Sequence, residues 1–394
     1  MPGWTTGWVR PGALRSEGRA WVPVVAALVC AMAAPQVQAQ NGGASQVTVY
    51  GLVDLGVEVS RAGQGRQQRL ISGGSSGNRL GFQGREDLGS GWAAQFRLEQ
   101  GFNADDGFLA QGGRAFGRES SVGLASRSWG TLSMGRIPLP YYLGLSGIDA
   151  FAWTGSGGML SLSQSGAASR QLLPLAISAR ADNAVSYVAP QWGGLEWRLL
   201  AAMGEKSATL GRLYSTSLRY RAGPWDGVAA WGRQYGAHDA AGAVNAWTLG
   251  GSYATGRWKL YAGGVQETND CTTCTGALAR SAGVGGRNAS AFRMLNLGAR
   301  FAMGPGAVYA QVTRVYDRSR YAVDPGNRNA TWLAVGGEYA LSKRTLVYGT
   351  LASIGNQHGS HYALGSGTAQ QPAGAVGPRD PRATTAVLGV RHRF

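Results

Sequence analysis

Apolar and polar residues alternate along most of this chain of 394 residues. In residues 46–60, valine or leucine occupies most of the odd-numbered positions. The even-numbered positions carry Thr48, Tyr50, Asp54 and Glu58. A repeat of two residues is typical of β-strands that turn one face to apolar surroundings. The pattern therefore predicts an all-β protein.

Sixteen segments show this alternation, and the last ends on Phe394. They are residues 46–60, 79–85, 92–100, 118–125, 131–136, 183–189, 195–203, 212–221, 227–235, 246–254, 258–267, 293–303, 307–317, 330–341, 345–354 and 384–394. Short turns alternate with long loops, which include residues 61–77 and 137–182. This is the pattern of a 16-stranded antiparallel transmembrane β-barrel in an outer membrane. A barrel of that size encloses an aqueous lumen.

The longest loop, residues 137–182, is apolar and aromatic in its first half and rich in serine and glycine in its second half. Tyr141 and Tyr142 belong to the aromatic half. Because exposing so many large apolar side chains to water is unfavourable, we expect this loop, the third long one, to fold into the lumen and to narrow it. The alternative is a hydrophobic, adhesive loop on the outer surface.

Aromatic residues recur at a constant distance from the short turns. Five of them stand three residues before a turn, namely Tyr187, Tyr220, Tyr253, Phe301 and Tyr339. Equal spacing places these rings at one height, as in the aromatic girdle at a membrane interface. The β-propensity of aromatic residues explains their presence in strands but not the constant spacing.

The first 39 residues read as a targeting segment. A basic start with three arginines precedes an apolar run over residues 21–34, and small residues follow up to Ala39. This order is typical of a signal peptide, and the run is shorter than the roughly 20 residues of a membrane-spanning helix. We expect residues 1–39 to be the signal peptide and residues 40–394 to form the barrel. Cleavage removes three arginines and one glutamate, so the net charge falls from +16 to +14.

The excess of basic residues lies on the polar face of the strands. The arginines in question are Arg79, Arg97, Arg136, Arg198, Arg219, Arg221, Arg314, Arg391 and Arg393. Arginine is permanently charged, and a charged channel concentrates ions of the opposite sign. An arginine-lined lumen would thus favour anions, unless carboxylates neutralise these side chains or they bind lipopolysaccharide phosphates at the rim. Nucleic-acid binding is disfavoured, because no basic run or recognition helix is visible.

Enzymatic and metal chemistry find little support. Residues 73–77 match G-x-S-x-G by letters but lie between two strands, without the helix that a nucleophile elbow requires. No cofactor motif is visible. Cys271 and Cys274 stand in a polar loop with no further zinc ligands nearby, so a local disulfide is favoured over a metal site.

A set of short motifs occurs in order along the chain. They are residues 47–54 (VTVYGLVD), 78–89 (NRLGFQGREDLG), 98–102 (LEQGF), 117–119 (GRE), 122–124 (VGL), 130–136 (GTLSMGR) and 147–149 (GID). Together they resemble the trimeric general porins of β-proteobacteria, such as those of Burkholderia, Bordetella and Comamonas. The resemblance implies a homotrimer whose third loop forms the constriction, with basic side chains at Arg79, Arg118 and Arg136. It also implies that the barrel-assembly machinery reads the end of the chain at Phe394.

We therefore expect an outer-membrane channel whose partners are lipopolysaccharide, other outer-membrane lipid and small anionic or hydrophilic solutes. The candidate constriction residues are Arg79, Arg97, Arg118, Arg136, Glu99, Asp149, Tyr141 and Tyr142. The leading hypothesis is passive diffusion with a preference for anions. The alternatives are a substrate-specific channel and a structural or adhesin barrel with a blocked lumen.

Overall fold

A computed structural model gives the fold of this chain. It describes residues 46–62, 65–152, 155–159, 162–164, 177, 179–205, 207, 210–271, 290–318, 328–358, 360, 362–364 and 382–394. The expected signal peptide and Cys274 lie outside these residues. Residues 44–394 belong to one compact unit. No helix in the described part of the chain is long and apolar enough to cross a membrane.

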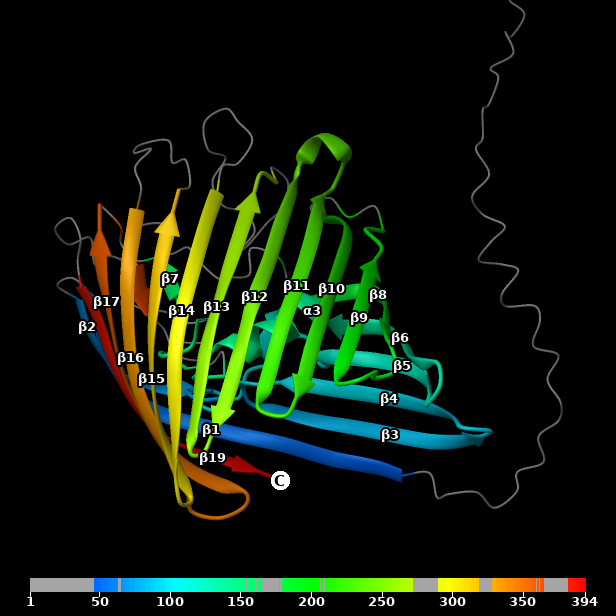
Figure 1. Ribbon diagram of the computed structural model, residues 1–394, viewed down its shortest axis with the longest axis horizontal. Coiled ribbons are helices and arrows are strands. Elements are labelled where there is room, and N and C mark those ends of the chain that lie inside the picture. Colours follow the sequence, from blue (N-terminus) through cyan, green and yellow to red (C-terminus); the bar gives the residue numbers. More distant parts are fainter. Residues whose placement is uncertain are drawn as a thin grey trace, which may run out of the picture. The chain divides into compact units, whose positions relative to one another are not determined.

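In the described ranges, sixteen strands of one sheet close into an antiparallel barrel (Figure 1). They are β1 (Gln46–Ala62), β3 (Arg79–Gly89), β4 (Trp92–Gly101), β5 (Glu119–Ser126), β6 (Gly130–Pro138), β8 (Arg180–Val188), β9 (Leu195–Ala202), β10 (Leu210–Ala222), β11 (Trp225–Gly236), β12 (Ala243–Thr255), β13 (Trp258–Asn269), β14 (Ser290–Met303), β15 (Gly306–Asp317), β16 (Arg328–Ala340), β17 (Thr345–Gln357) and β19 (Arg382–Arg393). The first and last strands pair, from Leu52 opposite Arg393 to Ala62 opposite Ala383. The 16-stranded barrel is thus confirmed, and each expected segment coincides with a strand.

The prediction of a long loop at residues 61–77 is wrong. Most of it forms a further strand, β2 (Gly65–Ser72), which pairs antiparallel with residues 55–62 of β1. Residues 46–52 of β1 pair with β3. The two strands thus share one position in the wall, interrupted by residues 73–78. The salt bridge between Arg69 and the fully buried Glu58, 2.5 Å long, ties β2 to β1.

The two faces of the strands meet different surroundings. On β1 the outward side chains Val47 and Val49 are 62% and 56% exposed, whereas the inward Asp54 and Glu58 are fully buried. An apolar outer face and a polar inner face are the reverse of a soluble protein and match a barrel surrounded by lipid.

The aromatic residues next to the short turns face outward, as the sequence predicts. Trp225 packs on Tyr253 with ring centroids 4.5 Å apart, and Trp258 packs on Phe301 at 4.7 Å. We call this end of the barrel the turn end and the opposite end the loop end. The rings mark the turn end as one membrane interface.

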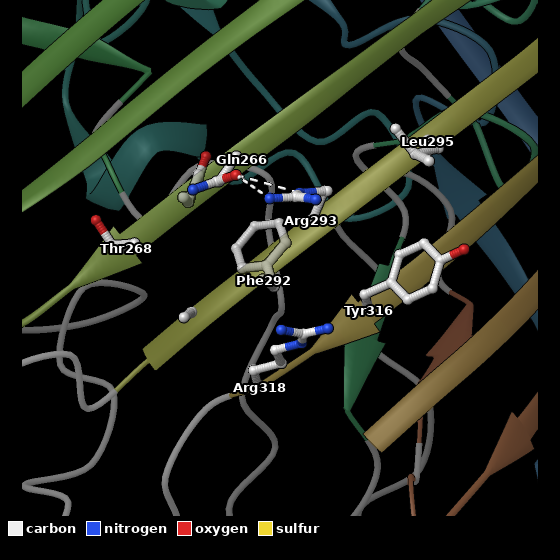
Figure 2. Close-up of a pocket in the computed structure, with 9 residues that line it drawn as sticks. Gln266, Thr268, Phe292, Arg293, Leu295, Tyr316 and Arg318 are labelled. Carbon is white, nitrogen blue, oxygen red and sulfur yellow. Dashed lines mark hydrogen bonds between the residues drawn. The ribbon is translucent and has the colours of Figure 1, made fainter. Parts of the chain in front are cut away.

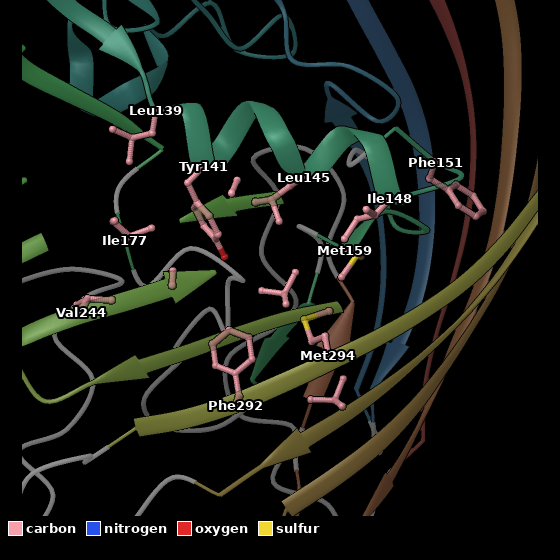
Figure 3. Packing of buried hydrophobic residues seen from close by; sticks show 14 of the residues in the cluster. Leu139, Tyr141, Leu145, Ile148, Phe151, Met159, Ile177, Val244, Phe292 and Met294 are labelled. Carbon is pink, nitrogen blue, oxygen red and sulfur yellow. The ribbon is translucent and has the colours of Figure 1, made fainter. Parts of the chain in front are cut away.

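Two short helical segments lie against the inside of the wall. They are α3 (Pro140–Leu145) and the 3₁₀ turn η1 (Ser146–Ile148), which pack on β10 to β13. Leu139, Leu145 and Ile148 are fully buried in this contact (Figure 3). The wall makes room with small residues, since a Cβ atom on Gly263 would lie 2.7 Å from Cβ of Ile148.

The remaining described elements lie in the connections. They are α2 (Ala110–Gly113), η3 (Asp239–Ala241), β7 (Leu162–Gln164) and β18 (Tyr362–Leu364). Strands β7 and β18 pair with each other, so the third long loop meets the last one. Tyr362 of β18 is buried and donates a hydrogen bond from its hydroxyl to Asp317 at 2.5 Å, which fixes this ribbon to β15.

Candidate functional site: the arginine cluster of the lumen

Five arginines gather on the inner face of the wall formed by β3 to β8. We call Arg79, Arg114, Arg118, Arg136 and Arg180 the arginine cluster. The guanidinium group of Arg118 lies beside Gly77, whose carbonyl accepts a hydrogen bond from Nε of Arg79 at 3.2 Å. Alternation along β3 places Arg79 inward, opposite to its neighbour Leu80. On β6 the alternation is interrupted by a register shift between Gly135 and Ile137, at the position of Arg136.

Hydrogen bonds to backbone carbonyls fix the orientation of two further guanidinium groups. Nε of Arg136 donates to the carbonyl of Gly117 at 2.7 Å. Nε of Arg180 donates to the carbonyl of Arg118, also at 2.7 Å. Each of these bonds joins neighbouring parts of the wall, so the cluster is held as one unit.

Carboxylates neutralise only part of this charge. Glu99 forms a 2.5 Å salt bridge with Arg118 and accepts a hydrogen bond from the hydroxyl of Tyr50 at 2.9 Å. Asp182 bridges Arg136 at 2.5 Å and Arg114 at 2.7 Å. Five arginines therefore face two carboxylates.

Arg79 and Arg180 have neutral partners. Arg79 donates from Nη2 to the hydroxyl oxygen of Ser76 at 2.7 Å. The guanidinium of Arg180 lies 5.7 Å from the ring centre of Tyr142, which projects from α3 towards the cluster. Of the predicted constriction residues, Arg79, Arg118, Arg136, Glu99 and Tyr142 are thus brought together.

Arg97 lies on the same inner face but belongs to a different contact. It is half exposed and forms a 3.6 Å salt bridge with Glu119. Both residues line a lumen pocket of about 530 Å³ that also contacts Arg85 and Arg198. Arg97 therefore adds to the charge of the lumen rather than to the arginine cluster.

Tyr141 and Asp149 do not face water, contrary to expectation. Tyr141 is fully buried and donates from its hydroxyl to the carboxylate of Glu267 at 3.0 Å. Burial beside this carboxylate raises the pKa of Tyr141 well above its usual value. Asp149 is 1% exposed and accepts hydrogen bonds from the amides of Phe151 at 2.8 Å and Met159 at 2.7 Å. Both side chains hold the loop in place, because each satisfies buried polar groups.

The 73–78 segment forms another part of the inner wall. The carboxylate of Asp54 accepts hydrogen bonds from the amides of Ser75 at 3.1 Å and Ser76 at 2.8 Å. Gly155, with φ of +68°, approaches the carbonyl of Gly74 so closely that a Cβ atom would lie 2.5 Å from its oxygen. The segment therefore connects the wall to the third long loop beside Arg79.

Sequence reasoning missed Arg114, Arg180 and Asp182, and it placed Arg314 on the wrong face. Arg180 and Asp182 were assigned to the loop, although they open β8. Arg314 follows the outward residues Val308 and Val312 at even spacing on β15, so the period-two rule itself places it outside.

Phe394 closes the wall next to β1. Its carbonyl accepts a hydrogen bond from the amide of Gly51 at 3.0 Å, and its amide donates to the carbonyl of Gly51 at 3.2 Å. A Cβ atom on Gly51 would lie 2.2 Å from Cζ of the Phe394 ring, so a larger residue at this position requires the ring to move. Cys271 is disulfide-bonded; because Cys274 lies outside the described residues, their pairing stays a prediction. No group of three His, Cys, Asp or Glu side chains in the described ranges could hold a metal ion.

A closed barrel of sixteen strands with a charged, polar interior and an apolar exterior is a channel through an outer membrane. The model of the Gram-negative porin family matches residues 24–359, and the chain belongs to this family. It is therefore a multi-pass β-barrel of the outer membrane, in a family of channels rather than enzymes.

Several known proteins resemble it over most of their length. The chain is 32% identical to outer membrane porin protein 32 of Delftia acidovorans and 28% identical to an outer membrane porin protein of Bordetella pertussis. Each match covers 89% of this chain and 94% of the relative. An anion-selective porin from Comamonas acidovorans superposes with a TM-score of 0.72 at 28% identity, over 89% of this chain and all of that one. A loop L8 deletion mutant of OmpT of Vibrio cholerae shares the fold with a TM-score of 0.63 at 14% identity.

Proposed function

We propose that this porin is a passive diffusion channel for small hydrophilic solutes that prefers anions. The observation that carries the proposal is the arginine cluster, in which Arg79 and Arg180 have neutral partners. The selectivity named for the Comamonas porin, which is similar over its full length, supports it.

Simple electrostatics gives the size of the effect. A permeant ion about 4 Å from one unit charge interacts with roughly 1 kcal/mol in bulk water and roughly 4 kcal/mol at the lower dielectric of a protein surface. Two or three uncompensated arginines therefore exceed thermal energy and repel cations. Added salt weakens the preference, because the Debye length falls to about 3 Å at 1 M.

The reversal potential across a planar bilayer in a salt gradient tests this proposal. We expect the double variant Arg79→Ser/Arg180→Ser to shift the potential towards neutrality. A matched control is Arg127→Ser/Arg257→Ser, which removes the same charge from exposed turns outside the lumen. An unchanged potential in the first variant, with a folded barrel, would overturn the anion preference.

The arginines that have carboxylate partners should matter less. Asp182 already neutralises part of the charge of Arg136, and it keeps its salt bridge with Arg114 when Arg136 is replaced by serine. We expect Arg136→Ser to shift the reversal potential by less than Arg79→Ser. Equal shifts would mean that hydrogen-bond partners do not decide which arginines act on ions.

Conductance separates the remaining hypotheses. A diffusion channel gives a current that rises in proportion to solute and voltage, a substrate-specific channel saturates, and a structural or adhesin barrel with a blocked lumen gives none. The narrowing of the passage by residues 139–151 is part of the proposal, supported by their packing on the inner wall.

We also propose that the barrel assembles as a homotrimer, inserted by the barrel-assembly machinery with Phe394 as its signal. Exposed apolar side chains along β1, β5 and β6 support a contact between copies or with lipid. Heat-modifiable migration in detergent gels tests the trimer, and migration as a monomer without heating would contradict it.

A further inference from the structure

A hollow in the lumen wall lies between the arginine cluster and the turn end, and we call it the turn-end recess. It is the pocket of about 530 Å³ lined by Arg97 and Glu119, and β1, β3 to β6, β8 and β9 contribute to it. Arg97 lies closer than Glu99 to the turn end, where β4 begins. The volume falls within the range of about 300–1,000 Å³ that is usual for small-molecule sites. A solute that has passed the arginine cluster therefore meets this recess next.

Short side chains leave the space for the recess. Ser121, Ser133 and Ser186 stand at inward positions of three neighbouring strands. Between them, Gly123 adds no side chain, and a Cβ atom there would lie 2.6 Å from Oγ of Ser133. Larger residues at these positions would fill the hollow, so its shape follows from the inward sequence of β5, β6 and β8.

The recess offers hydroxyl and amide groups to a solute. In the described part of the chain, five lining side chains form no hydrogen bond with the protein, namely those of Gln46, Thr48, Gln95, Thr131 and Ser133. Each of them can both donate and accept. Because these groups face the lumen, solute hydroxyls can replace the water that they bind. A polyhydroxylated solute thus finds several partners here.

Two of the three arginines in the recess are neutralised by carboxylates. Arg97 pairs with Glu119 at 3.6 Å. Arg198 pairs with Glu196 at 2.9 Å. Arg97 also donates from Nη2 to the amide oxygen of Gln83 at 3.1 Å. These pairs add polarity to the recess but little net charge.

Arg85 supplies the charge that remains. It is exposed, and within the described ranges its side chain has neither an ion pair nor a hydrogen bond. It lies opposite Gln46 on β1 and opposite Gln95 on β4. Asp87 follows on the same strand, but its carboxylate accepts a hydrogen bond from the amide of Gly89 in the turn, at 2.9 Å. The recess therefore combines one available guanidinium group with neutral donors and acceptors.

A second pocket, of about 390 Å³, lies on the other side of the wall (Figure 2). Its lining includes Gln266, Glu267 and Arg293, and Arg293 donates to the amide oxygen of Gln266 at 3.2 and 2.8 Å. Gln266 and Arg293 alternate with the buried, inward Glu267 and Phe292, so they face outward. A solute inside the lumen does not reach this pocket. Arg293 is therefore a suitable control for Arg85.

From these observations we infer that the turn-end recess binds sugar acids, which are polyhydroxylated chains with one carboxylate. The carboxylate binds the guanidinium group of Arg85 through charge-assisted hydrogen bonds. The hydroxyls of the solute bind the side chains of Gln95, Thr131 and Ser133. One available positive charge matches a single carboxylate better than a doubly charged phosphate. The inference rests on the proposed function, since the solute must enter the lumen, and it adds the class of solute.

Block of the chloride current by added solutes tests the inference without any variant. Gluconate has one carboxylate and a chain of hydroxyls, hexanoate has the same charge and carbon number without hydroxyls, and sorbitol has the hydroxyls without the charge. In a planar bilayer with dilute KCl, we expect gluconate to halve the current at a concentration about tenfold below that of either comparison solute, because each of these lacks one kind of contact. Equal concentrations for gluconate and either comparison solute would overturn the proposed site.

Variants then test the residues. Arg85→Gln should raise the gluconate concentration for half-block about tenfold, because a charge-assisted contact is lost. Arg293→Gln removes the same charge from the outward pocket and should leave this concentration unchanged. Thr131→Val/Ser133→Ala should weaken the block by gluconate but not the block by hexanoate. Equal effects of the two arginine variants, or normal gluconate block in the Thr131/Ser133 variant, would contradict the assignment.

The reversal potential in a KCl gradient separates this inference from the proposed function. Thr131→Val/Ser133→Ala changes no charge, so its reversal potential should equal that of the original protein. If gluconate and hexanoate block the original protein equally while the potential still shows anion preference, the recess is refuted and the proposed function stands. An original protein without anion preference would refute the proposed function, whatever the solutes do.

Discussion

Asp54 gives the sharpest test of how the inner wall is built. It is fully buried, and its carboxylate accepts hydrogen bonds from the amides of Ser75 and Ser76 and from the hydroxyl of Tyr348 at 2.6 Å. Asp54→Asn keeps the shape of the side chain but replaces one acceptor oxygen by a donor group. At least one amide or the tyrosine hydroxyl then loses its partner and meets another donor.

The expected loss follows from these contacts. A hydrogen bond to a charged group contributes about 1.5–3 kcal/mol, and an unsatisfied buried donor costs a similar amount. Asparagine avoids the desolvation of a buried charge, which offsets part of the loss. We therefore expect the free energy of unfolding to fall by about 2–4 kcal/mol.

Unfolding in urea, followed by tryptophan fluorescence of the refolded barrel in detergent, measures this difference. Single-channel recordings should also become noisier, because the 73–78 segment beside Arg79 loses its anchor. Asp105→Asn is the matched control, since it makes the same change in an exposed loop. An Asp54→Asn barrel as stable and as quiet as the control would refute this account of the segment.

Three further predictions concern the loop, the chain end and the disulfide. Tyr141→Phe removes the hydroxyl donated to a buried carboxylate and should lower the free energy of unfolding by about 1–3 kcal/mol, measured in the same urea assay; an unchanged midpoint would contradict the proposed anchoring of α3. Deleting Phe394, or replacing Gly51 by valine, should reduce the amount of heat-modifiable barrel in the outer membrane; normal levels would argue against closure at this seam. Cys271 and Cys274 should resist alkylation until the exported protein is reduced, and free thiols in the non-reduced protein would exclude the bridge.

The period of two residues predicted the strands well because the membrane imposes it. Each outward residue meets lipid along the full height of the wall, so a position such as Val47 reads clearly in the sequence. The same period of two residues places Arg314 on the outward face. The sequence analysis placed it in the lumen because it assigned all charged strand residues to the polar face. Residue type is a weaker guide than spacing where the wall reaches the interface.

The constriction was harder to predict, for a different physical reason. Residues of a folded loop have no fixed alternation. The sequence therefore could not show that Tyr141 packs against the barrel wall and Asp149 is buried within the loop, while Tyr142 faces the arginines. β2 was missed because Gln67 and Gln68 offer little apolar contrast, and its pairing with β1 depends on a partner distant from any local pattern. Arg180 and Asp182 were hidden by the same uncertainty about where β8 begins.

The loop segment on the inner wall also has a mechanical consequence. Residues 139–151 contact β10 to β13 through α3 and η1, and then β14 and β15 through hydrogen bonds from Asn296 to the carbonyl of Ile148 and from the amide of Ala150 to Gln311. A barrel wall made of a single curved sheet is easily flattened by lateral pressure. A loop segment that is bound to the wall at several points opposes this deformation. On this half of the circumference the wall is braced against the lateral pressure of the bilayer. The bore should thus keep its cross-section when the barrel moves between bilayers of different thickness.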